Sequence, residues 1–163
     1  MPRQIEIIFV NRNVRGVATL LDDAAPRTCA AVWDALPLEN VTNHARWAGR
    51  EVYILVPPLA SDPGDENSTV FPIPGDLLFF TVPASSIDVP PERRTGKPFV
   101  DVALFYGRNS HLLGPAGYMP GNLFATVSEN LAGLAAACES IFREGAAHER
   151  MLFRRIESDK TGG

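Results

Sequence analysis

The chain has 163 residues, of which 45% are hydrophobic and 21% charged, and its 15 basic and 19 acidic side chains leave a net charge of −4. This apolar content excludes intrinsic disorder and indicates one globular domain over residues 1–163. The mild acidity, without any block of Lys or Arg, argues against a nucleic-acid or a membrane partner. Because no apolar run is long enough to span a membrane and the N-terminus lacks a signal-peptide core, we expect a cytoplasmic protein.

The first third of the chain predicts a β-hairpin followed by a helix. Apolar and β-branched residues predict strands over Ile5–Phe9 and Gly16–Leu21, which a short turn joins. A helix begins at Asp23 or Ala24 and ends at Leu36, since a proline follows directly.

Further strands are predicted along the rest of the chain, at Glu51–Val56, Leu77–Val82, Val100–Tyr106, Phe124–Val127 and Met151–Ile156. Polar, Gly-rich and Pro-rich stretches separate them and predict loops over 59–70, 83–98 and 107–122. The tail, residues 158–163, is expected to be frayed.

A second helix is predicted over Leu131–Phe142, where apolar residues recur at helical spacing, with Gly145 as its C-cap. The preceding Thr126–Glu129 has the capping-box pattern. The apolar stripe of this helix is either core or a subunit interface, and it favours a homo-oligomer. Cys29 and Cys138 lie on apolar helix faces and predict buried free thiols in a reducing compartment.

Six or more strands with two helices and few long crossovers predict a mainly β fold. The expected architecture is a small closed β-barrel whose open ends are capped by the two helices.

Several stretches resemble known sequences. Gly16–Leu36 resembles the opening strand and helix of cyclophilins, in which acidic residues and an Ala-Pro-basic-Thr start precede the helix. Trp47–Tyr53, Pro74–Asp76 and Phe105–Arg108 follow in the order seen in bacterial cyclophilin-like families of unknown function. The resemblance implies a cyclophilin-like barrel over most of the first 127 residues.

The motifs of the prolyl-isomerase site are missing from this sequence. The Phe-His-Arg, Phe-x-x-Gln-Gly-Gly-Asp and Asn-Gly-Ser-Gln-Phe-Phe strings do not occur. The barrel is therefore expected without the isomerase site, because function resides in sites rather than in folds. Peptidyl-prolyl isomerase and non-enzymatic oligomeric scaffold are the alternatives.

One candidate cluster lies between the first helix and the strand at Glu51–Val56. His44 is predicted as a base or acid and Arg46 as an anion-binding fork, while Asn43 and Trp47 are predicted to bind a ligand. The alternative is that these residues have no ligand-binding role: Trp47 is then part of the core, Arg46 forms an ion pair, and His44 is solvated.

A second cluster follows the strand that ends at Tyr106. Tyr106, Arg108 and Asn109 are predicted ligand-binding residues and His111 a catalytic acid or base. An ordinary polar turn is the alternative. The two clusters would share a ligand if both lined one barrel mouth.

Glu51 is the remaining catalytic candidate, as a general base with a pKa raised by burial. Asp76 is interpreted as a turn residue and Asp101 as an edge or partner-facing charge. Histidine spacing predicts no metal site, and no cofactor-binding motif occurs. The function predicted is binding of a small anionic or amide-bearing metabolite; if the protein is an enzyme, a hydrolase is favoured over an isomerase.

Overall fold

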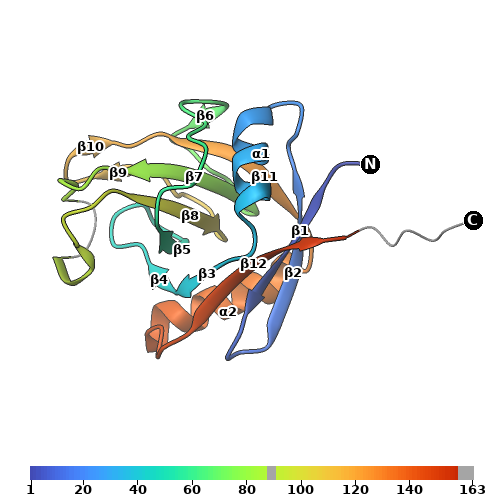
Figure 1. Cartoon of the computed structure of the whole chain (residues 1–163). Coiled ribbons are helices and arrows are strands. Elements are labelled where there is room, and N and C mark those ends of the chain that lie inside the picture. Colours follow the sequence, from blue (N-terminus) through green and yellow to red (C-terminus); the bar gives the residue numbers. More distant parts are fainter. Residues whose placement is uncertain (88–90, 158–163) are drawn as a thin grey trace, which may run out of the picture.

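The structure, a computed structural model, describes residues 1–87 and 91–157 (Figure 1). Within this part of the chain it is mainly β, as predicted, with two α-helices: α1 (Pro26–Ala35) and α2 (Leu131–Glu144). A short 3-10 turn, η1, covers Pro91–Arg93. The strands are β1 (Gln4–Phe9), β2 (Val14–Leu20), β3 (Leu38–Val41), β4 (Asn43–His44), β5 (Glu51–Val56), β6 (Ser68–Thr69), β7 (Asp76–Val82), β8 (Phe99–Phe105), β9 (Leu113–Gly114), β10 (Gly117–Tyr118), β11 (Gly121–Glu129) and β12 (Arg150–Ile156).

The main sheet runs in the order β3-β12-β1-β2-β11-β7-β8-β5-β4, and β6 adds to β11. Neighbouring strands are antiparallel. The long strand β11 lies between β2 and β7 and pairs with both. Its register shifts against β7 after Leu123 and against β2 after Val127. Such irregularities bend a strand, and Figure 1 shows the β1–β2–β12 part of the sheet turned relative to the β5–β7–β8 part.

The prediction of a closed barrel is wrong, because the hydrogen-bonded path of the sheet stays open. Its two outermost strands, β3 and β4, are consecutive in the chain, with Thr42 between them. β3 pairs with β12 and β4 with β5, and the described residues form no strand pairing between β3 and β5. A side-chain bond from Asn40 Nδ2 to the Leu55 carbonyl, 2.7 Å long, spans this edge instead.

Two apolar clusters lie on opposite faces of β5, β7 and β8. The larger one fills the inner side of the bent sheet, where α1 and α2 contribute residues such as Val32 and Ile141. The smaller one lies on the outer face and includes Phe80, Phe105 and Leu112. Because both faces are buried, these strands are almost continuously apolar in sequence.

Alternation along β5 assigns its side chains to the two clusters. Val52, Ile54 and Val56 belong to the inner cluster, whereas Tyr53 and Leu55 belong to the outer one. Residue 51 therefore shares the outer face with Tyr53, which determines the environment of the acidic side chain there.

The predicted capping box is wrong. Residues 126–129 are the end of β11, where Glu129 pairs with Val17 of β2. The helix instead begins after Asn130, which has φ 61° and whose Oδ1 accepts a bond from Gly133 N at 3.2 Å. Strand pairing outweighs the local capping preference here.

Other predictions about the helices are confirmed. Gly145 is the C-cap of α2, and Cys29 and Cys138 are buried free thiols. Part of the apolar face of α2 is buried within its own chain, through Leu134, Ala137, Cys138 and Ile141, whereas Phe142 at the end of the predicted stripe is 60% exposed.

The remaining differences concern short elements. Residues 38–44, for which no element was predicted, form β3 and β4, and the predicted loop 107–122 contains β9 and β10 and the start of β11. The tail 158–163 lies outside the described residues, as do residues 88–90 of the predicted loop 83–98. Neither helix in the described part of the chain has the length and apolar character to cross a bilayer.

Candidate functional site

A pocket opens on the outer face of β5, β7 and β8. The segments 45–48 and 112–119 form its rim, and its empty volume is about 570 Å³, including space open to solvent. Small-molecule sites are concave and mostly apolar, with a few polar groups that fix the ligand, and this pocket has that character. The pocket is therefore the candidate functional site.

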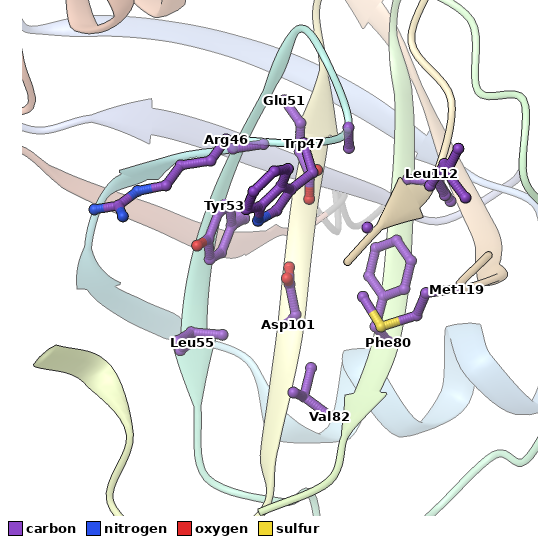
Figure 2. Close-up of a pocket in the computed structure, with 14 residues that line it drawn as sticks. Arg46, Trp47, Glu51, Tyr53, Leu55, Phe80, Val82, Asp101, Leu112 and Met119 are labelled. Atoms are coloured by element: carbon purple, nitrogen blue, oxygen red, sulfur yellow. The ribbon is translucent and has the colours of Figure 1, made fainter. Parts of the chain in front are cut away.

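Two buried carboxyl groups line this pocket. Glu51 begins β5 and Asp101 lies within the neighbouring β8, and their exposed fractions are 5% and 7%. In Figure 2 their carboxyl groups point toward one another along the strand direction; in the register of β5 and β8 the Tyr53–Ala103 pair lies between their positions. No donor in the described part of the chain bonds to either group, and Asp101 Oδ1 is a fully buried acceptor without a hydrogen-bond partner.

Burial controls the protonation of this pair. It raises the pKa of Glu51 to about 8, and it raises the pKa of Asp101 well above its usual value, with a further contribution from the charge on Glu51. Burial also raises the pKa of Tyr53, to which the charges of Asp101 and Glu51 add. Burial therefore favours the protonated form of both carboxyl groups.

The other walls of the pocket are apolar. Phe80, Leu112 and Met119 surround the side of the pocket away from Tyr53 (Figure 2). The Phe80 ring occupies the space where a Cβ on Gly121 would lie, so any larger residue at this position of β11 would displace that ring. Trp47 lies at the rim and is 56% exposed, so its indole is accessible to a ligand.

Arg46 contributes to the pocket rim, but its guanidinium does not face the carboxyl pair. Figure 2 shows its side chain extending away from Glu51 and Asp101. The guanidinium donates to Glu92 Oε1 at 3.2 Å, and both partners of this ion pair are largely exposed. Of the nine site residues predicted from sequence, the pocket thus includes Arg46, Trp47 and Glu51.

His44 and Tyr106 are brought together elsewhere, in contact with α2. The Tyr106 hydroxyl donates to His44 Nε2 at 2.7 Å, since His44 Nδ1–H donates to the Ala45 carbonyl at 2.8 Å. The His44 ring also lies 5.0 Å from that of Phe142. Burial lowers the pKa of His44 and raises the pKa of Tyr106 to about 12. The pair is neutral and internally satisfied.

The other predicted residues lie outside the pocket. Arg108, Asn109 and His111 are exposed, and Asn43 donates to the Val41 carbonyl at 3.4 Å. The two predicted clusters are adjacent in the backbone, because His111 N donates to the Ala48 carbonyl at 3.2 Å. Their side chains nevertheless do not converge on one cavity.

The sequence interpretation underestimated Asp101 and omitted Tyr53. Asp101 is not an edge charge, because β8 lies between β5 and β7 in the sheet. A usable signal was present: a strand that is apolar on both sides of an aspartate predicts burial of that carboxylate. Asp76, by contrast, is the predicted turn residue, and its Oδ2 accepts from Ile73 N at 2.9 Å.

Residues 1–87 and 91–157 contain no group of three or more His, Cys, Asp or Glu side chains arranged to hold a metal ion. The pocket therefore offers two carboxyl groups, one phenol and apolar walls as its chemistry.

These features define a mainly β protein with a carboxyl pair in an apolar pocket. The chain belongs to the family described as protein of unknown function DUF3830, which matches residues 7–153. No curated protein matches the sequence.

Two solved structures show the same fold. McbB, whose structure was determined in complex with tryptophan, is 18% identical with a TM-score of 0.66, and the match covers 97% of this chain but 46% of McbB. The chain thus spans about half the length of McbB. The hypothetical protein AF2241 from Archaeoglobus fulgidus is 20% identical with a TM-score of 0.51, over 95% of both chains. At these identities the likeness concerns the fold alone.

Proposed function

We propose that the protein binds a small, largely apolar molecule that carries an amine, with the nitrogen seated between Glu51 and Asp101. The observation that carries this proposal is the unpartnered, buried Asp101 Oδ1 facing Glu51 across an apolar pocket. A buried acceptor without a donor costs free energy, and an N–H group of a ligand would remove that cost.

The charge of the proposed ligand differs from the anionic ligand expected from the sequence. An anion in the pocket would face two carboxyl groups, while the guanidinium of Arg46 points outward to Glu92. An ammonium group is attracted by a carboxylate, and this attraction is stronger in an apolar pocket than in water. The walls formed by Phe80 and Met119, with Trp47 at the rim, suit an apolar or aromatic body.

Tryptophan, the molecule named with McbB, carries an amine and an aromatic body, together with a carboxylate. We use this only to choose aromatic probes, because 18% identity supports the fold alone.

The test compares three probes that share a phenyl group. Calorimetric titration and thermal unfolding of the full chain with 2-phenylethylamine should show binding and a raised Tm, since a ligand that binds only the folded state stabilises it. The alcohol 2-phenylethanol should bind more weakly, and 3-phenylpropanoate should not bind. Glu51→Gln and Asp101→Asn should each weaken binding of the amine, whereas Glu92→Gln, an exposed carboxyl outside the pocket, should leave it unchanged.

Binding of 3-phenylpropanoate in place of the amine would overturn the proposal and restore the anionic ligand. Equal binding of the alcohol and the amine would show that only the apolar walls recognise the ligand.

Hydrolysis of a small amide is the second candidate. Burial raises the pKa of Glu51 to about 8 in a pocket open to solvent, which suits a general base that activates water at mildly alkaline pH. Incubation with 2-phenylacetamide should then release phenylacetate and ammonium, and Glu51→Gln should abolish the release. Absence of turnover, together with binding of the amine, would leave amine binding as the function.

Membership of the cyclophilin-like families is retained as a prediction from the sequence, together with the cytoplasmic location and the homo-oligomer. The isomerase and scaffold alternatives also remain predictions, and the carboxyl pair favours neither of them.

A further inference from the structure

The Glu51–Asp101 pair must hold protons when the pocket is empty. Both carboxyl groups are almost fully buried, and they lie on adjacent strands of one sheet face. Two like charges in such an environment would each lose hydration and would also repel one another. A buried carboxyl group in this situation becomes neutral by binding a proton.

Among the described residues, no cation faces the Glu51–Asp101 pair. Arg46, from the rim segment, directs its guanidinium to Glu92, and its positive charge and that of Arg93 on η1 act on Tyr53. Neither arginine contributes to the pKa of Glu51, which burial alone raises.

The remaining titratable groups are neutral or otherwise engaged. On β5, Tyr53 is a phenol whose pKa burial raises further. On β7, Asp76 belongs to the same face by strand alternation, and its carboxylate accepts from Ile73 N. In segment 112–119, Tyr118 is 60% exposed. Protons on Glu51 and Asp101 are therefore what keeps the empty pocket neutral.

We propose that an amine enters this pocket as its ammonium ion and that its binding releases one proton from the Glu51–Asp101 pair to solvent. The inference rests on the amine-binding function proposed above. The exchange is balanced in charge and atoms: R–NH3⁺ and two COOH groups become R–NH3⁺, one COO⁻ and one COOH, with one H⁺ leaving. The new carboxylate and the remaining acid stay hydrogen-bonding partners for the nitrogen.

Proton release makes affinity depend on pH. Below the pH at which the pair loses its first proton in the empty pocket, each unit of rising pH should tighten binding about tenfold, because one proton leaves for each ligand bound. The affinity should become independent of pH once the empty pocket has already lost that proton. It should weaken again above about pH 10, where an amine comparable to lysine loses its own charge.

Calorimetric titration of the full chain with 2-phenylethylamine tests the inference. At about pH 6.5 the binding enthalpy is measured in several buffers and plotted against the ionisation enthalpy of each buffer. The slope of this plot should correspond to release of about one proton per ligand. At about pH 9 the slope should approach zero. Glu92→Gln is the matched control and should keep the release of one proton, whereas the double variant Glu51→Gln/Asp101→Asn, which lacks both acids, should release none.

A second probe separates charge from shape. The neutral 2-phenylacetamide, if it binds, should release no proton, because it brings no positive charge into the pocket. Binding of 2-phenylethylamine without proton release, and with one Kd from about pH 6 to 8, would overturn this inference and leave the amine-binding function intact. Failure of 2-phenylethylamine to bind at any pH up to about 9 would overturn both.

Discussion

Two buried carboxyl sites in this protein have opposite surroundings. Glu149, just before β12, is fully buried and accepts bonds from Asn11 N at 2.7 Å, from Arg12 N and Nη1 at 3.0 Å each, and from Arg150 N at 2.9 Å. Glu51, in the pocket, is as well buried but has no donor in the described part of the chain.

The pKa values of the two residues move in opposite directions for this reason. Burial alone would raise the pKa of Glu149, but the bonds from Asn11, Arg150 and Arg12 outweigh burial and lower it. For Glu51 nothing opposes burial, and its pKa rises to about 8. The comparison teaches that burial does not by itself single out a candidate functional carboxyl group, whereas burial in a cavity without hydrogen-bond donors does.

The largest effect is expected at the satisfied site. Glu149→Gln should lower the free energy of unfolding by about 3 kcal/mol, because charge-assisted bonds from three backbone amides and a guanidinium are lost or weakened. Urea denaturation measures this. The control Glu39→Gln, which breaks the exposed ion pair with Arg150, should change stability by less than about 1 kcal/mol. Equal effects of the two changes would mean that the buried bonds around Glu149 contribute little.

The pH dependence of stability should reveal the unsatisfied site. A carboxyl group whose pKa is higher in the folded than in the unfolded state binds more protons when folded, so stability falls as pH rises between the two values. For Glu51 this window runs from 4.5 to about 8.

At about pH 8, Glu51→Gln should therefore be more stable than the original chain by at least about 1.4 kcal/mol, the equivalent of one pKa unit. The difference should vanish near pH 4.5, and denaturation at a series of pH values measures it. A difference that does not vary with pH would show that Glu51 is not protonated in the folded protein.

A smaller effect is expected on the inner face. Tyr106→Phe removes the hydroxyl that donates to His44 Nε2, which should lower the free energy of unfolding by about 1 kcal/mol. Affinity for 2-phenylethylamine should not change, since Tyr106 does not line the pocket. A loss of affinity in this variant would assign the His44–Tyr106 pair to the ligand site.

The smallest effect concerns the rim. Arg46→Ala breaks an exposed ion pair with Glu92, and the free energy of unfolding should change by less than about 0.5 kcal/mol. A loss of 3-phenylpropanoate binding in this variant would instead support the anion-binding role predicted for Arg46.

Sequence reasoning identified several components of the site but not their grouping. Glu51 and Trp47 were predicted site residues and both line the pocket. Asp101 was interpreted as an edge or partner-facing charge, because the local pattern of apolar residues does not show which strands become neighbours in an antiparallel sheet. Once β8 lies between β5 and β7, the same aspartate is buried and faces Glu51.

By itself the sequence determined the mainly β character, both helices and most of the long strands, since alternation, helical spacing and prolines act within a few residues. Tertiary structure decided what depends on contacts between residues far apart in the sequence. These are the sheet that stays open between β3 and β5, the end of β11 at residues 126–129 where a capping box was predicted, and the pocket. The pKa of Glu51 belongs to the second group, because it is raised by desolvation, which arises only when β5 and β8 pair and the rim segments cover them.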